Sequence, residues 1–267
     1  MIVFTDLDGT LLDHETYRFD AALPALEALT ARGVPLVLAT SKTAAEIGPI
    51  RQALGCDVPA IVENGGGIVW AGDAAVASLD DYSDIRATLD ALPPRLRAMF
   101  RGFGDMDEAG IASLTGLSEE QAGRARQRRH SEPGLFSGTS TEHDKFLACL
   151  EEHGLRAVQG GRFLTVGRDT SKSRRMQEVR TELERRLGRP LAPVVALGDA
   201  ENDREMIEAA DIGVVVANPA HAPLPPLAGE AEGRIRRTTL PGPAGWNAAV
   251  LGILGEYAPP AHGGASG

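Results

Sequence analysis

The chain has 267 residues, of which 43% are hydrophobic and 24% are charged, enough for a buried core in one large or two modest domains. Its net charge of −10 argues against a general nucleic-acid binder, which needs a basic face for phosphates, but leaves room for a local basic pocket that takes an anionic substrate. The distant cysteines Cys56 and Cys149, without a CxxC pair or a Cys/His cluster, argue against a disulfide scaffold or a structural zinc site.

The first part of the chain alternates apolar strands with helices. Short apolar runs predict strands at 2–4 and 34–40, and apolar residues at helical spacing predict helices over 20–33 and 43–55. Residues 60–70, AIVENGGGIVW, predict a third strand, a glycine-rich turn and a strand that returns. This β-α-β-α-β order predicts a parallel sheet with helices on both faces.

The same alternation resumes late in the chain. Helices are expected over 171–188 and 201–210, and strands over 193–199 and 212–218. The segment between the two parts mixes short helices with short strand candidates, which indicates an α+β insertion. We therefore predict an α/β fold, with a Rossmann-like parallel-sheet core and an inserted α+β cap over the crevice at the carboxyl ends of the strands.

These elements divide the chain into a core at 1–80 and 165–257, a cap at 81–164 and a flexible tail at 258–267 that is rich in Pro, Gly and Ala. The opening MIVFTDLDG reaches an acidic turn too soon for a signal peptide. No apolar run approaches the ~20 residues of a membrane span. We expect a cytoplasmic protein with neither a membrane nor a nucleic acid as partner.

Two aspartates follow the first strand in the stretch FTDLDGTLLD. Side chains two apart in an extended segment face the same way, so the carboxylates of Asp6 and Asp8 would enter one cavity, and Gly9 permits the turn that follows. A solvated acidic turn is the alternative, but ligands bind at the ends of buried strands in parallel sheets. Asp13, in the same stretch, gains no role.

A second acidic group, GDAENDREM, follows a later strand. Asp199 ends the apolar run, and Asn202 and Asp203 open the next helix. Together with Asp6 and Asp8, these oxygen-bearing side chains predict a site for a hard cation such as Mg²⁺. For Asn202 or Asp203 taken singly, N-capping of the helix is an equally good interpretation.

Two further segments supply hydrogen-bond donors and a positive charge. Thr40 and Ser41 in ATSKT lie at the end of a strand and the start of a helix, where the helix N-terminus favours anions. Lys172 in TSKS opens another helix, where the helix dipole disfavours a cation. This mismatch indicates another task for Lys172, although a solvated lysine is the simpler reading.

The motifs DLDGT, ATSK, Lys172 and GDAEND, in this order, resemble those of the haloacid dehalogenase-like phosphohydrolases. The resemblance implies that Asp6 attacks phosphorus and forms an aspartyl-phosphate, while Asp8 protonates the leaving oxygen and then activates water. It also implies Mg²⁺ held by Asp6, the Asp8 carbonyl and Asp199. Thr40 and Lys172 would hold the phosphoryl oxygens.

The most distinctive stretch of the expected cap is LTGLSEEQAGRARQRRHSEPGLF, residues 114–136. Arg124, Arg128 and Arg129 are expected on nearly one side of a helix in it. They would form either a solvated basic face or a set of forks for a carboxylate.

This stretch and the turn VENGGGIVW resemble those of mannosyl-3-phosphoglycerate phosphatases, which implies a C2B-like cap. Such a substrate carries a phosphate, a carboxylate and sugar hydroxyls. Residues expected to contact it are Glu63, Asn64, Arg124, Arg128, Arg129, Ser131 and Glu132. Ser173 departs from the family pattern directly after Lys172 in the third motif. His130 departs from it in the cap, so the sugar preference stays open.

We therefore predict a Mg²⁺-dependent phosphatase of mannosyl- or glucosyl-3-phosphoglycerate, which releases a glycosylglycerate used as a compatible solute. A broader sugar or polyol phosphatase, a phosphomutase and a non-catalytic phosphosugar-binding module are the alternatives. The intact set of Asp6, Asp8, Lys172 and Asp199 argues against the last, because binding alone does not need Asp8.

Overall fold

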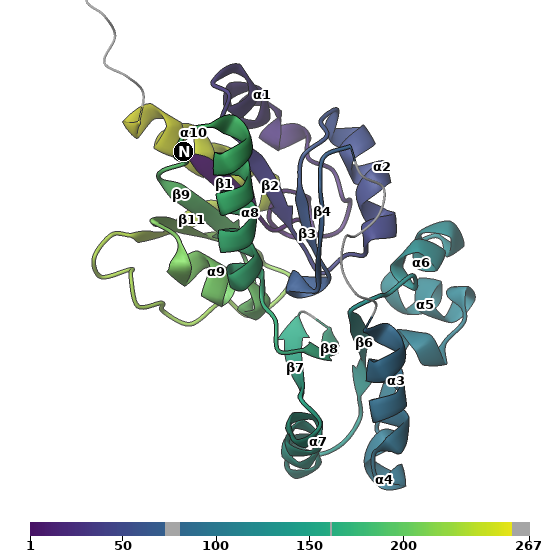
Figure 1. Cartoon of the computed structure of the whole chain (residues 1–267). Helices are drawn as coiled ribbons and strands as arrows, with labels where there is room; N and C mark the ends of the chain where they lie inside the picture. Colours follow the sequence, from purple (N-terminus) through teal and green to yellow (C-terminus); the bar gives the residue numbers. More distant parts are fainter. Residues whose placement is uncertain (73–80, 161, 258–267) are drawn as a thin grey trace, which may run out of the picture.

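The structure, a computed structural model, describes residues 1–72, 81–160 and 162–257, arranged as a larger core with a smaller unit beside it (Figure 1). The tail expected at 258–267 lies outside the described residues. Within these ranges, every helix is too short or too polar to cross a bilayer.

The core is a seven-stranded sheet whose strands come from both ends of the chain. They are β1 (Ile2–Thr5), β2 (Leu36–Ala39), β3 (Ala60–Val62), β4 (Gly67–Val69), β9 (Val194–Gly198), β10 (Ile212–Ala217) and β11 (Ile235–Pro241). Their order is β11-β10-β9-β1-β2-β3-β4, and all neighbours are parallel except β3 and β4. The predicted α/β fold is confirmed.

Helices cover both faces of this sheet because successive residues of a buried strand point to opposite sides. Val3 of β1 packs in one apolar cluster with helices α1 (Leu23–Ala31), α2 (Ala44–Leu54) and α10 (Gly242–Glu256). Its neighbour Phe4 packs in another cluster with α8 (Lys172–Leu187) and α9 (Arg204–Ala209). The central strands are therefore buried on both sides, and their polar groups lie at the strand ends.

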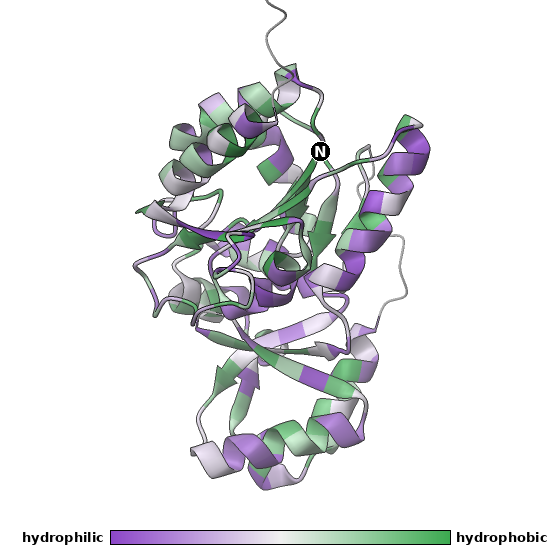
Figure 2. Ribbon diagram, turned by 90° about the vertical axis from the view of Figure 1, so that its left-hand side faces the viewer, coloured by the Kyte–Doolittle hydropathy of each residue, from purple (hydrophilic) through white to green (hydrophobic). Residues whose placement is uncertain are grey.

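The smaller unit contains a four-stranded antiparallel sheet of order β5-β6-β8-β7. Its elements are α3 (Tyr82–Ala91), α4 (Pro94–Arg97), β5 (Phe100–Gly102), α5 (Glu108–Thr115), α6 (Glu119–Ala125), β6 (Ser131–Phe136), α7 (Ser140–Glu152), β7 (Leu155–Gly160) and β8 (Phe163–Arg168). The sheet lies between the core and the apolar helices α3 and α7 (Figures 1 and 2). Its other face is therefore turned toward the core.

We propose to divide the chain into core and cap along these two sheets. The strand β8 continues past residue 164 to Arg168, so the second boundary belongs after Arg168 rather than at 164. The first boundary, at 80, adjoins the residues 73–80 that the structure does not describe.

The last strand and helix, β11 and α10, were not predicted. Trp246 of α10 is fully buried, and its Nε1 donates a hydrogen bond to Thr5 Oγ1 at 2.9 Å. Thr5 Oγ1 in turn donates to the backbone carbonyl of Asp6 at 2.8 Å. The C-terminal helix thus supports the strand end that carries the first acidic motif.

Candidate active site

Three of the predicted polar residues lie at one edge of the core sheet. Asp6, Thr40 and Asp199 directly follow β1, β2 and β9, and β1 is paired with both other strands. All three side chains are buried, with Asp6 6% and Asp199 4% exposed. The rule that parallel strands present their ligands at the carboxyl ends therefore predicted this edge.

Lys172 is the buried cation of this edge. It is only 1% exposed, and its Nζ donates to Asp6 Oδ1 and to Asp203 Oδ1, each at 2.6 Å. Burial lowers the pKa of Lys172, but the carboxylates of Asp203 and Asp6 together raise it above its ordinary value. The lysine therefore stays charged inside the protein, which answers why it stands at an unfavourable helix start.

The two carboxylates on Lys172 repel each other. Burial, followed by the charge of Asp203, raises the pKa of Asp6 well above its ordinary value, although Lys172 opposes the rise. Burial also raises the pKa of Asp203. A second cation near Asp6 would stabilise its ionised form.

Asp199 has a different environment, made by side chains that sequence reasoning missed. Its oxygens accept from Thr10 Oγ1 at 2.7 Å and from Asn218 Nδ2 at 2.8 Å, and His221 Nε2 lies 2.8 Å away. Burial would raise the pKa of Asp199, but these contacts, led by His221, lower it. The hydrogen bond to Asp199 raises the pKa of His221 to about 9. Asn218 directly follows β10, so the strand-end rule could have found it.

Gly9 makes the close approach of the first and last motifs possible. Its φ is +83°, and a Cβ at this position would stand 2.1 Å from Asn218 Nδ2 and 2.9 Å from Asp199 Oδ2. Only glycine can adopt this positive φ without strain and also leave room for the Asn218 and Asp199 side chains. The sharp turn expected from the sequence is therefore also a packing contact between two motifs.

The carboxylates of Asp6, Asp199 and Asp203 each offer an oxygen within 4.8 Å of the others. Three buried carboxylate oxygens suit a hard divalent cation such as Mg²⁺. The side chain of Asp8 pairs with Lys42, which leaves the predicted ligand, the Asp8 carbonyl, as a prediction, and Asn202 donates to Asn64 Oδ1 at 3.1 Å. Asp203 also accepts from the backbone N–H of Asp199 at 3.1 Å, so it positions the loop as well.

Asp8 forms an ion pair that was not predicted. Lys42 Nζ lies 2.8 Å from Asp8 Oδ2. The other oxygen, Asp8 Oδ1, is buried and accepts no hydrogen bond from any described residue. Lys42 directly follows the predicted phosphate-binding pair, in which Thr40 Oγ1 accepts from the Lys42 backbone N–H at 3.1 Å.

Glu63 and Ser131, predicted to contact substrate, form contacts that join the core to the smaller unit. The Glu63 carboxylate accepts from the backbone N–H groups of Arg129 and His130, each at 3.0 Å, and from Ser131 Oγ at 2.8 Å. Arg128 Nε lies 3.4 Å from Glu63 Oε2. Glu63 is 2% exposed, and its φ of +49° shows that the backbone is strained to place it there.

The expected shared helix face of Arg124, Arg128 and Arg129 is wrong. The helix α6 ends at Ala125, because the backbone beyond it turns to meet Glu63 and begins β6. Arg124 pairs with Glu120 at 2.7 Å, on the outside of the helix. Arg128 is 8% exposed and donates to Ser41 O at 3.1 Å and Ser131 Oγ at 2.6 Å.

Glu132 is also held within the smaller unit. It is fully buried and accepts from Tyr82 Oη at 2.6 Å, Arg86 Nη1 at 3.0 Å and the Gly104 backbone N–H at 2.7 Å. Asn64 instead lies beside the fourth motif through its contact with Asn202.

Glu63→Gln is expected to lower the free energy of unfolding by ~1–3 kcal/mol, because an amide cannot match both oxygens of the carboxylate and leaves a buried donor unpaired. The exposed Glu27→Gln is the matched control, with no expected change. Urea unfolding of both variants measures the difference. An unfolding energy equal to that of the wild type, with a raised KM, would restore Glu63 as a substrate contact.

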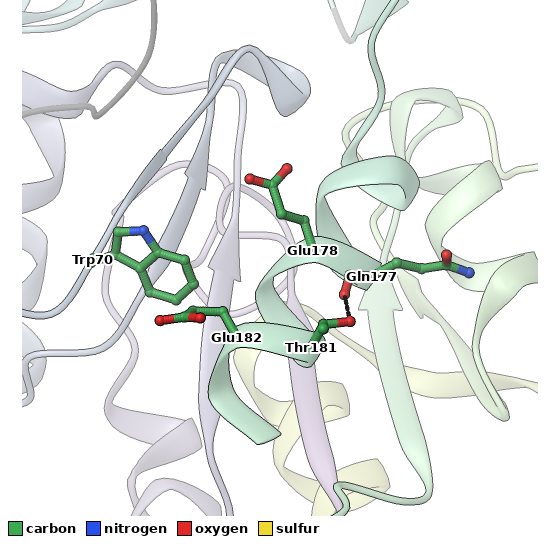
Figure 3. A pocket seen from close by; sticks show the side chains of 5 residues that line it. All are labelled: Trp70, Gln177, Glu178, Thr181 and Glu182. Carbon is green, nitrogen blue, oxygen red and sulfur yellow. Dashed lines mark hydrogen bonds between the residues drawn. The ribbon is translucent and has the colours of Figure 1, made fainter. Parts of the chain in front are cut away.

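A surface pocket of about 520 Å³ lies away from this edge, between the end of β4 and the outer side of α8 (Figure 3). It is lined by Trp70, Gln177, Glu178, Thr181 and Glu182. Glu182 pairs with Arg185 and Arg186, and Arg186 stacks on the Trp70 ring at 4.4 Å. The charged groups of this pocket are therefore paired with one another, and we look for the active site at the strand ends instead.

Residues 3–91 and 165–223 match the model of a family described as haloacid dehalogenase-like hydrolases. The chain is 33% identical over 270 residues to a glucosyl-3-phosphoglycerate/mannosyl-3-phosphoglycerate phosphatase of Methanococcoides burtonii, covering 96% of this chain and 97% of that one. A phosphatase of the same name from Persephonella marina is 34% identical over 278 residues, covering 96% and 98%. A solved phosphatase of the HAD superfamily from Bacteroides thetaiotaomicron shares the fold, with a TM-score of 0.66 and 20% identity over 96% of this chain and 94% of that one.

Proposed function

This chain belongs to the haloacid dehalogenase-like hydrolases, and we propose that it is a Mg²⁺-dependent phosphatase that hydrolyses a glycosyl-3-phosphoglycerate. The observation that carries the proposal is the convergence of Asp6, Asp8, Lys172 and Asp199 from three separated segments on one sheet edge. Two relatives with phosphatase activity on this class of substrate, each matching nearly the whole chain, support the choice of leaving group.

In the first step, the Asp6 carboxylate attacks phosphorus and displaces the glycerate oxygen, forming an aspartyl-phosphate. The Asp8 carboxylic acid donates its proton to that oxygen as it leaves. Lys172 holds Asp6 Oδ1 at 2.6 Å and so fixes the nucleophile, and its positive charge favours the phosphoryl oxygens.

In the second step, water attacks the aspartyl-phosphate and Asp8, now a carboxylate, takes its proton. Phosphate leaves, Asp6 is regenerated, and Asp8 is again protonated for the next cycle. Asp6 and Asp199 would hold Mg²⁺, which would supply positive charge to offset the charge of the transferring group. Thr10, Asn218 and His221 keep the Asp199 carboxylate ionised for that task.

Phosphate release from mannosyl- and glucosyl-3-phosphoglycerate and from glucose 6-phosphate tests the proposal. We expect kcat/KM for the glycosyl-phosphoglycerates to exceed that for glucose 6-phosphate by about 10- to 100-fold, the scale of one charge-assisted hydrogen bond to the substrate carboxylate. EDTA is expected to abolish release, and added Mg²⁺ to restore it.

Other outcomes separate the alternatives. Equal turnover of glucose 6-phosphate would identify a broader sugar phosphatase. Full activity in EDTA would remove the metal from the proposal. Tight Mg²⁺-dependent binding of phosphosugars without release of phosphate from any ester would indicate a binding module.

A further inference from the structure

Lys42 is a buried charge that the proposed chemistry does not use. Its side chain is 13% exposed, and its ammonium group lies 2.8 Å from Asp8 Oδ2, the residue assigned as general acid. The sequence placed it next to the phosphate-binding hydroxyls without giving it a task. A cation in contact with the general acid lies beside the leaving group of any ester that Asp8 can protonate.

Tyr17 fixes the position of this cation from the other side. Lys42 Nζ lies 5.2 Å from the centre of the Tyr17 ring, a cation–π distance. Tyr17 has a φ of +55°, which is strained for a bulky residue, and it is 41% exposed. Strained backbone of this kind clusters at ligand-binding sites, where the surrounding structure holds it in place.

Asp13 holds the loop that carries Tyr17. Its Oδ1 accepts from the Thr16 backbone N–H at 2.9 Å and from Thr16 Oγ1 at 2.7 Å, and its carbonyl accepts from the Tyr17 N–H at 3.0 Å. The aspartate that gained no role from the sequence thus positions an exposed aromatic ring over Lys42.

We propose that Lys42, held between Asp8 and the Tyr17 ring, binds the carboxylate of the glycerate unit and so selects carboxylate-bearing phosphate esters. The inference rests on the proposed function. In a 3-phosphoglycerate ester, the carboxylate carbon is three bonds of about 1.5 Å from the leaving oxygen, so the cation nearest the general acid is within its reach.

Charge complementarity favours the same assignment, because the ammonium group of Lys42 has three donors and can bind a substrate carboxylate as well as Asp8. Two of the three arginines expected to do this have other partners, since Arg124 pairs with Glu120 and Arg128 with Glu63.

The test compares two esters that differ only in the carboxylate: glucosyl-3-phosphoglycerate and 2-O-glucosylglycerol 3-phosphate, which has CH₂OH in its place. Lys42→Met is expected to lower kcat/KM for the first ester about 10- to 100-fold, mainly through KM, and to change the second much less. Lys42→Arg should keep most of the preference. Tyr17→Leu should reduce it by a smaller factor in the same direction.

The controls are Lys145→Met, at an exposed lysine of α7, and Arg124→Met, and both should leave the preference unchanged. If Lys42→Met lowers kcat/KM equally for both esters, or for neither, carboxylate binding by Lys42 is overturned and the proposed function still stands. Collapse of the preference with Arg124→Met would assign the carboxylate to that residue.

A wild-type enzyme without preference for the carboxylate ester would overturn the proposed function and this inference together. Thermal unfolding shows whether each variant is folded. If Lys42→Met does not fold, the substrate preference of Lys42→Arg tests the inference in its place.

Discussion

Asp6→Asn is expected to reduce phosphate release by on the order of 10⁵-fold, because an amide cannot attack phosphorus and the covalent step is lost. The fold should persist. Lys172 keeps Asp203 as a buried partner at 2.6 Å. The change also removes the Asp6 carboxylate, which is costly to ionise there, since burial and the charge of Asp203 raise its pKa well above the ordinary value. The free energy of unfolding without Mg²⁺ should therefore be unchanged or increased.

Single-turnover assays with acid quenching measure this result. The wild type should yield a phosphorylated protein and Asp6→Asn none. Asp20→Asn is the matched control, because Asp20 is exposed and pairs only with the exposed Arg18 among the described residues. A phosphorylated intermediate in Asp6→Asn, or turnover within tenfold of the wild type, would show that another residue is the nucleophile.

Lys172→Met is expected to have the largest effect on stability. It leaves the Asp6 and Asp203 carboxylates buried without their shared cation, and removal of one partner of a buried ion pair costs ~3–5 kcal/mol. Without Lys172, the pKa of Asp6 should rise further, so less of the nucleophile is ionised. Activity should fall ~10²- to 10³-fold, the effect of losing one preorganised donor.

Urea unfolding with and without Mg²⁺ separates the two effects. Added Mg²⁺ should recover part of the stability that Lys172→Met loses, because a bound cation again neutralises the carboxylates, whereas Lys145→Met should match the wild type throughout. A loss of less than ~1 kcal/mol would show that the two carboxylates share a proton and need no cation.

The sequence predicted most of the core sheet, since each strand there is a short apolar run. Buried parallel strands are apolar on both faces, so the signal is local. The strand β11 was missed because Arg236 and Arg237 interrupt its apolar run, and the helix α10 because the glycines Gly242 and Gly245 weaken its helical signal. Their structure depends on packing, as Trp246 shows by being fully buried beside β1.

Several residues predicted to contact substrate make structural contacts that the sequence does not reveal. Motif residues such as Glu63, Arg128 and Ser131 read equally well as substrate contacts or as structural ones, because the sequence contains no measure of burial. The structure shows that Glu63 accepts hydrogen bonds from residues 66 to 68 positions away. Their contacts therefore join the core to the cap sheet.

The sequence by itself determined which residue types stand at the strand ends, and with them Asp6, Thr40 and Asp199. Their common edge follows from the parallel sheet that the local patterns predict. Only the tertiary structure decided the charge partners: Lys172 meets Asp6 across 166 positions and Lys42 meets Asp8. Ionisation depends on desolvation and on charges a few ångströms away, and the folded chain brings these together regardless of their distance in sequence.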